Sequence, residues 1–304
     1  MPGYVFHKNT VETDQETSLI QAIWKYIDET GDSTILDEEV NGMTVRARME
    51  KMLDYLMKHR YNEEYGLIWG ATTADWGDVQ AKHKWGVKLD DLSIPAIDIY
   101  DNAMMLIALD NFIEMAGDTT FTNKWITVYE EIRKNARKHL WDKERCRFIP
   151  HLYIRYPEFP GIDEKNIYYH GGTIVAIEAG LLTKQEVEKS LKMMLQNVED
   201  AGAASIGLTI YPPYPDGSFE NKGMGAYSYQ NGGDWTWFGA RIIPPLVKLG
   251  YLEEAITILD PFIERAIKNE GFYEWYTRDN EPRGSGIFRG SAGVILSAIE
   301  AVID

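Results

Sequence analysis

Apolar residues recur three and four positions apart along most of the chain, the spacing that places them on one face of an α-helix. In segment 17–29 this stripe consists of Leu19, Ile20, Ile23, Trp24 and Ile27. The same periodicity predicts helices at 44–59, 103–116, 125–140, 173–179, 183–198, 235–249, 252–268 and 291–302. Thr183 followed by Glu186 is a capping-box pattern that marks one helix start. The sequence therefore predicts about nine helices and no convincing run of strands.

The connections between these helices are of two kinds. Some are short, whereas four are long and rich in Gly, Trp, Tyr and Asp, at 61–99, 144–170, 201–234 and 269–290. Ordered loops of this length in a compact domain are usually functional. Helical hairpins with all long loops on one face form an α/α toroid, so we expect an all-α, six-hairpin barrel.

No Pro/Ser-rich linker or charge block divides the chain, so residues 1–304 are predicted to be one catalytic domain. A complete toroid has twelve helices, about three more than the periodicity supplies. The extended, polar opening MPGYVFHKNTVETDQET fits a barrel that is incomplete at its N-terminus, as the C-terminal part of a longer family plan would be.

The charge of the chain restricts its partners. The formal net charge is −16, so the long-range field repels nucleic acid and anionic membrane surfaces. No apolar run approaches the roughly 18 residues of a membrane span, and no signal peptide is visible at the start. A cytoplasmic location is the default expectation, and nothing in the sequence specifies an oligomeric state.

Aromatic residues are unusually placed. Nine Trp and eighteen Tyr occur, many of them beside Gly, Asp and Asn in the long loops rather than in helical stripes. Aromatic faces next to hydrogen-bonding groups suit sugars, whose C–H faces stack while their hydroxyls bond outward. The alternative is that Tyr and Trp close the core with their polar ends satisfied.

A glycosidase needs two carboxyl groups. One protonates the leaving oxygen, and the other activates water or attacks the sugar. The loop segment 66–78 holds Asp75 and Asp78 around Trp76, with Trp69 nearby. A neighbouring Trp lowers solvation and keeps a carboxyl protonated for general-acid work. Alternatively, one Asp stabilises a turn and the other is solvated.

A second acidic candidate is Glu274, which four aromatic residues surround in the segment 271–276. An unpaired carboxylate buried among aromatic rings costs free energy, so we expect Glu274 to be either functional or paired with a cation. Salt bridging to Arg278, Arg283 or Arg289 is the alternative.

A third segment, 227–237, offers groups suited to binding sugar. Gln230 and Asn231 provide amides, Trp235 and Trp237 provide stacking faces, and two glycines allow close backbone approach. Asp234 is expected to cap the helix that follows.

Other kinds of site find no support. The six His residues show no metal-binding spacing, and no phosphate-binding glycine motif or nucleophile elbow occurs, so neither metal nor cofactor is expected. Cys146 is the single cysteine, which excludes an internal disulfide. A toroidal sugar epimerase would need paired histidines in its pocket, and only His151 and His170 are available.

Taken in order, several segments resemble a known family. The chain is similar to the catalytic toroid of inverting glycosidases in the processing α-glucosidase, mannosylglycerate hydrolase, trehalase and debranching-enzyme group, with α-L-rhamnosidases and sugar phosphorylases as more distant relatives. The resemblance covers nearly the whole chain. It is carried by TGD at 30–32, TADWGD, YDNAMMLIALDNFIEMAGD, LWDKERCRF, AIEAGLLT, YQNGGDWTW and GFYEWY followed by GSGIFRGSAGVILSAI.

The resemblance implies an inverting hydrolase acting on an α-linked glycoside. It places the general base at Glu274 and the general acid in the TADWGD loop, at Asp75 in preference to Asp78. The two carboxyls of such an enzyme lie about 6.5–9.5 Å apart to admit a water. Expected substrate contacts come from Trp69, Trp76, Tyr100, Asp101, Gln230, Asn231, Trp235, Trp237, Tyr273 and Trp275.

Three alternatives to this function remain open. The loop reads closer to the DWND of phosphorylases, so an inverting sugar phosphorylase is one. An α-L-rhamnosidase-like enzyme is the second, and a toroid that binds carbohydrate without catalysis is the third.

Overall fold

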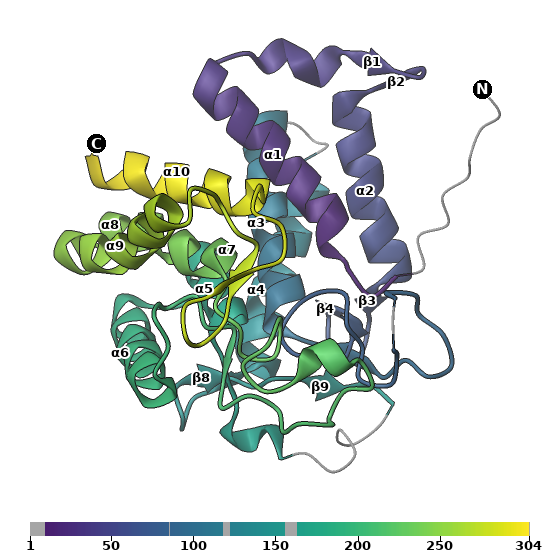
Figure 1. Ribbon diagram of the computed structural model, residues 1–304. Coiled ribbons are helices and arrows are strands. Elements are labelled where there is room, and N and C mark those ends of the chain that lie inside the picture. The colour runs from purple at the N-terminus through teal and green to yellow at the C-terminus, as the bar shows by residue number, and fades with distance from the viewer. Residues whose placement is uncertain (1–9, 85, 118–121, 156–162, 304) are drawn as a thin grey trace.

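The protein is mostly helical, and the computed structural model describes residues 10–84, 86–117, 122–155 and 163–303 (Figure 1). The helices are α1 (Asp14–Thr30), α2 (Val45–His59), α3 (Ile99–Ala116), α4 (Asn123–His139), α5 (His170–Glu178), α6 (Lys184–Ala201), α7 (Thr236–Gly239), α8 (Ile243–Lys248), α9 (Leu252–Lys268) and α10 (Arg289–Ile303). Short 3-10 helices are η1 (Ser33–Asp37), η2 (Glu164–Asn166), η3 (Lys222–Met224) and η4 (Ala240–Ile242).

The helices form an inner row, and a second, outer helix packs on most helices of that row. Helices α1, α3 and α5 contact one another in this order, and the row continues through η4 to α10. Helices α2, α4, α6 and α9 pack on α1, α3, α5 and α8 respectively.

Helix α3 lies at the centre of this arrangement. Twelve of its residues are buried, which explains why its sequence is apolar on nearly every face rather than along one stripe. One apolar core runs from Ile20 on α1 to Ala298 on α10 and includes α3 throughout. Helices α3 and α5 are thus covered by neighbours on nearly all sides, as inner helices of an α/α toroid are, whereas α1 and α10 bury only two and three residues respectively.

The strands are two or three residues long and serve to fold the loops back. They pair as β1 (Glu39–Val40) with β2 (Met43–Thr44), β3 (Tyr61–Asn62) with β4 (Leu67–Ile68), β7 (Trp141–Asp142) with β8 (Arg147–Phe148), β10 (Tyr168–Tyr169) with β11 (Ile210–Tyr211), and β12 (Trp275–Tyr276) with β13 (Pro282–Arg283). A three-stranded sheet joins β5 (Gly70–Ala71), β6 (Pro95–Ile97) and β9 (Leu152–Tyr153). All of these pairs are antiparallel.

Most predicted helices agree with the structure, and the capping box of Thr183 and Glu186 at α6 is confirmed. Two differences have local causes. Helix α3 begins at Ile99, four residues before the predicted start, because the Asp98 side chain accepts a hydrogen bond from the Asp101 amide and caps it. The predicted helix 235–249 is broken into α7, η4 and α8, where prolines occupy the first turn of α8.

The long connections 61–98 and 201–234 gather at the lower end of the helices in Figure 1, below α3 and α5. Among the described residues, no helix has the length and apolarity needed to cross a membrane.

Candidate active site

The two aspartates of the DWGD turn have different surroundings. Asp75 is fully buried, and its Oδ1 accepts a hydrogen bond of 3.2 Å from the Gly172 amide at the start of α5. A Cβ on Gly171 would lie 2.2 Å from Asp75 Oδ2, so only glycine permits this contact. Burial raises the pKa of Asp75 well above its usual value, and the Gly172 and Gly171 amides offset this in part. Asp75 is therefore packed against α5 in surroundings that favour its protonated form.

Asp78, in contrast, is half-buried and bound by the segment 227–237. Gln230 Nε2 donates to Asp78 Oδ1 at 2.8 Å, and the Tyr229 hydroxyl lies 3.5 Å from Asp78 Oδ2. Gly77 has φ +97°, and a Cβ there would lie 2.4 Å from Gln230 Nε2. The glycine of the DWGD turn thus permits the close approach of Gln230 to Asp78.

Glu274 is half-buried immediately before β12. Its Oε2 accepts a hydrogen bond of 3.2 Å from the Ser285 amide in the returning strand of the hairpin. The ion pairs found among the described residues do not include Glu274. Arg283 pairs with Glu281 at 2.6 Å instead, and the guanidinium of Arg278 lies 4.9 Å from the centre of the Tyr227 ring.

Tyr229 links the two half-buried carboxylates. Burial raises the pKa of Tyr229, and the charges of Asp78 and Glu274 raise it further, while its hydroxyl lies 3.5 Å from Asp78 Oδ2. The centre of its ring lies 5.2 Å from that of Trp235 and 6.1 Å from that of Trp275. Sequence reasoning missed this residue, although it directly precedes Gln230 in a segment that was singled out.

Aromatic side chains surround this cluster. The Trp76 ring meets Trp235 edge to face, with centres 4.7 Å apart, and meets Phe238 at 4.5 Å. Trp235 Nε1 donates to the Tyr229 carbonyl at 2.9 Å, which fixes the indole. The structure therefore brings together Trp76, Trp235, Trp275 and Tyr229 beside Asp78 and Glu274.

Three of the predicted substrate contacts lie at the start of α3 or next to it. The Tyr100 hydroxyl donates to Asp14 Oδ2 at 2.8 Å, and Asp101 is buried so close to Gly70 that a Cβ there would approach it to 2.7 Å. The Trp69 ring lies 4.9 Å from the guanidinium carbon of Arg60. Each of these side chains has a partner within the protein.

Two predicted contacts, Trp237 in α7 and Tyr273 before β12, lie beside the start of α10. The Trp237 ring lies 4.8 Å from the guanidinium carbon of Arg241 and contacts the backbone near Gly290. Tyr273 packs on Gly286, and its carbonyl accepts from Ser291 Oγ at 2.8 Å. Trp237 and Tyr273 thus have structural contacts that sequence reasoning did not foresee.

Asn231 and Asp234 stabilise the loop itself. Asn231 is fully buried, accepting from the Tyr214 amide at 2.7 Å and donating to the Tyr214 and Met224 carbonyls at 3.0 Å each. The expectation that Asp234 caps α7 is wrong, because its Oδ1 lies 2.9 Å from Arg265 Nη1 and the helix has no side-chain cap. Asp234 is thus held in a buried ion pair.

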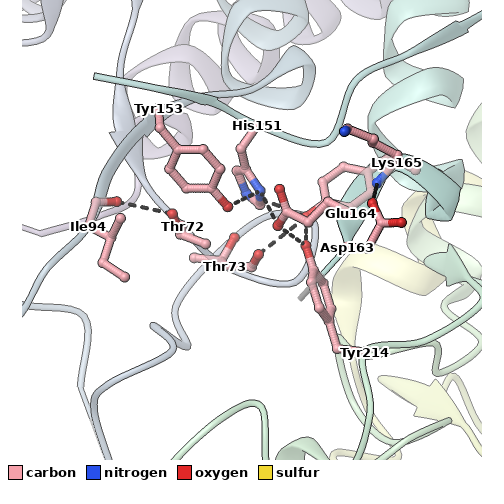
Figure 2. A network of polar contacts seen from close by, with 10 residues as sticks. Thr72, Thr73, Ile94, His151, Tyr153, Asp163, Glu164, Lys165 and Tyr214 are labelled. Carbon is pink, nitrogen blue, oxygen red and sulfur yellow. Dashed lines mark hydrogen bonds and ion pairs between the residues drawn. The ribbon is translucent and has the colours of Figure 1, made fainter. Parts of the chain in front are cut away.

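Behind the acid-bearing loop lies a buried polar network, in which His151, Glu164 and Tyr214 cluster beside Thr73 (Figure 2). His151 Nδ1 lies 3.0 Å from Glu164 Oε1, and the Tyr214 hydroxyl donates to the same oxygen at 2.7 Å. Tyr169 extends the network to the Thr73 carbonyl at 3.3 Å. The network therefore ties the loops 61–98, 144–170 and 201–234 together.

His170 is also buried, with its Nε2 2.9 Å from Asn197 Nδ2. Burial lowers the pKa of His170 to about 3, so the ring is neutral. The two histidines that an epimerase would need are therefore both enclosed, each bonded to a different partner.

Glu12 is a carboxylate near the site that sequence reasoning missed, because its segment was expected to be merely extended and polar. The amide of Val11 donates to the Val87 carbonyl at 2.7 Å, which lays this segment along the acid-bearing loop. Burial raises the pKa of Glu12, as do the charges of Asp14 and Asp78, while Thr10 acts in the opposite direction. In the described part of the chain, no group of three or more His, Cys, Asp or Glu side chains is arranged to hold a metal ion.

No protein-family model matches the sequence, and no curated protein matches it either. Solved structures do match. The GH63 mannosylglycerate hydrolase from Thermus thermophilus, in complex with Tris, has a TM-score of 0.64 at 12% identity over 97% of this chain and 79% of its own. An uncharacterized conserved protein from the same organism has a TM-score of 0.67 at 11% identity over 99% of this chain and 80% of its own.

The GH78 family rhamnosidase of Bacillus sp. GL1 has a TM-score of 0.59 at 14% identity over 94% of this chain. This chain spans only 26% of the length of that rhamnosidase. Identities this low establish a shared fold. The chain has the α/α toroid fold of six-hairpin glycosidases and is structurally similar to the toroid domains of GH63 mannosylglycerate hydrolase and GH78 rhamnosidases.

Proposed function

We propose that this chain is an inverting glycoside hydrolase acting on an α-linked glycoside, with Asp78 as general acid and Glu274 as general base. The observation that carries the proposal is the position of Tyr229, whose hydroxyl lies 3.5 Å from Asp78 Oδ2 and whose ring centre lies 6.1 Å from that of Trp275, the residue after Glu274. Asp78 and Glu274 are almost 200 positions apart in sequence, so their convergence on one aromatic cluster is a product of the fold.

Asp78 replaces Asp75 as the preferred acid because of exposure. A general acid must reach the glycosidic oxygen within hydrogen-bonding distance. Asp75 is fully buried against α5, whereas Asp78 is half-buried beside Trp76. We assign Asp75 the role of holding the turn in place through the amide of Gly172.

In the proposed reaction, Asp78 gives its proton to the leaving oxygen as the glycosidic bond breaks. Glu274 removes a proton from a water that attacks the anomeric carbon from the opposite face, which inverts its configuration. Trp76, Trp235 and Trp275 exclude bulk water and stack on the sugar. Gln230 and Tyr229 hold the carboxyl of Asp78 in position.

The test is a screen of aryl α-glycosides on the wild type, with product anomers followed by NMR. Asp78→Asn and Glu274→Gln should each lower kcat by about 10²- to 10⁴-fold with unchanged folding. Asp75→Asn is the matched control, and it should keep most of the activity because Asn keeps the shape of the buried side chain and can still accept from the Gly172 amide. An unaffected Glu274→Gln variant would remove Glu274 from the mechanism.

Phosphate decides between hydrolysis and phosphorolysis. If turnover depends on inorganic phosphate and yields a sugar phosphate, the chain is a phosphorylase and the proposed water is replaced by phosphate. Binding of glycosides with no turnover under either condition would favour a carbohydrate-binding toroid. Turnover of rhamnosides alone would favour the activity that the similar GH78 structure suggests.

A further inference from the structure

Hydrogen-bond acceptors without donors collect beside Asp78. Gln230 is 2% exposed, and while its Nε2 donates to Asp78, its Oε1 is buried without a hydrogen-bond partner. Oε2 of Glu12 is likewise buried without a partner that meets hydrogen-bond geometry, although the Thr10 side chain interacts with this carboxyl. A buried acceptor without a donor is destabilising, so these atoms favour a ligand that supplies donors.

Three donors around the cluster are already engaged within the protein. The Tyr229 hydroxyl faces Asp78, and Trp235 Nε1 donates to the Tyr229 carbonyl. The Ser285 amide donates to Glu274. At these three positions, a ligand that can only accept hydrogen bonds, such as a carboxylate, therefore finds no free donor.

The charges near the cluster are predominantly of one sign. Asp78 and Glu274 both act on Tyr229, and Asp14 and Asp78 both act on Glu12. These carboxylates belong to a chain with a net charge of −16, so the local field and the long-range field have the same sign.

Three cations close to this region have partners within the protein. Arg283 pairs with Glu281, and Arg278 lies over the Tyr227 ring. The guanidinium of Arg60 donates to the Thr10 carbonyl and interacts with Asp101.

Arg60 is the residue most able to oppose this charge argument. Its Nη1 is buried without a partner, and its charge acts on Glu12 and Glu16 as well as on Asp101. These three carboxylates offset the single positive charge. The Arg60→Met variant tests whether the three carboxylates offset the positive charge of Arg60 completely.

We propose that this site selects glycosides whose group beside Asp78 and Glu12 is neutral or cationic and rich in hydrogen-bond donors, and discriminates against carboxylated glycosides. The inference deepens the proposed function and rests on it, since it concerns the substrate class of the same site. A hydroxyl or ammonium donates to Gln230 Oε1 and Glu12, whereas a carboxylate adds a like charge and no donor.

The experiment uses three matched glycosides of one sugar, with 2-hydroxyethyl, 2-aminoethyl and carboxymethyl aglycones. We expect kcat/KM for the carboxymethyl compound to be at least about tenfold lower than for the hydroxyethyl compound at low salt. Added salt should raise the carboxymethyl value, lower the aminoethyl value and leave the hydroxyethyl value unchanged, because screening weakens attraction and repulsion alike. Equal values at all salt concentrations would overturn the inference while leaving the hydrolase proposal intact.

Calorimetric binding of the same three compounds separates the two proposals. If none is turned over, the hydrolase proposal fails, and the order of their affinities still tests the charge selectivity. Absence of binding by all three would overturn both proposals.

Charge variants locate the effect. Glu12→Gln should shrink the difference between the carboxymethyl and aminoethyl compounds several-fold, whereas Glu130→Gln on the exposed side of α4 changes the net charge equally and should not. Preference for the carboxymethyl compound, lost in Arg60→Met, would instead make Arg60 an anion-binding residue and refute the proposal.

Discussion

Replacing Gly77 with alanine tests how the DWGD turn reaches its partner. Gly77 has φ +97°, and an added Cβ would lie 2.4 Å from Gln230 Nε2, the atom that donates to Asp78. The substitution therefore has two separable effects, one on the backbone and one on the position of Gln230.

The backbone effect follows from the positive φ, which costs an L-residue about 1–2 kcal/mol. Unfolding entropy of about 2.1 cal/mol/K per residue converts this to a Tm decrease of about 2–3 °C for 304 residues. Displacement of Gln230 removes a hydrogen bond to the protonated carboxyl of the proposed acid, worth about 0.5–1.5 kcal/mol. If that bond supports Asp78 during catalysis, kcat/KM should fall about two- to tenfold.

Gly86 provides the matched control, because it has φ +91° in the same loop and an added Cβ there would meet no atom within 4 Å. Gly86→Ala should lower Tm by a similar amount and leave kcat/KM unchanged. Steady-state kinetics on the glycoside substrate and thermal unfolding measure both quantities. In a double-mutant cycle, Gly77→Ala should add little to the activity loss of Gln230→Ala. Full activity in Gly77→Ala, or equal activity losses in both glycine variants, would refute the reasoning.

Three further predictions concern buried ionisable side chains. Burial raises the pKa of Asp75, so its ionisation destabilises the fold, and the free energy of unfolding should decline as pH rises above about 4. Chemical denaturation at several pH values measures this decline, which should be smaller in Asp75→Asn. Burial lowers the pKa of His170 to about 3, so its contribution to stability is present above about pH 6.5 and is lost as pH falls toward 3. NMR should find the imidazole neutral at pH 5. A charged ring at that pH would contradict the burial argument. Arg265→Met leaves Asp234 buried without its partner and should cost about 3–5 kcal/mol in urea unfolding, whereas a cost below 1 kcal/mol would mean that the ion pair is not structural.

The helical content could be predicted because periodicity and capping are local properties. Helix α9 was predicted at its observed bounds, and the capping box placed the start of α6 to within one residue. The break between α7 and α8 was also readable from Pro244 and Pro245, but the apolar residues on both sides of them favoured one continuous helix.

The candidate site was predictable as a set of segments and less so as individual side chains. A sequence states that Asp75 and Asp78 share a turn, but their exposure depends on α5, which lies almost 100 residues further along the chain. The amide of Asn231 has the same chemistry in a pocket as in a loop, and only the fold assigns it to the Tyr214 backbone. Glu12 is relevant to the site because its charge interacts with that of Asp78, and no local sequence pattern predicts this interaction.

The segment 227–237 is attached to both carboxylate-bearing turns, by Gln230 to Asp78 and by backbone hydrogen bonds of 2.9 and 2.8 Å between Asp234 and Tyr276. Loop grafting that exchanges this segment alone would therefore detach it from both turns at once. Engineers who wish to change substrate preference in this barrel should transplant the three segments as a unit, or restrict their libraries to side chains that make none of these attachments.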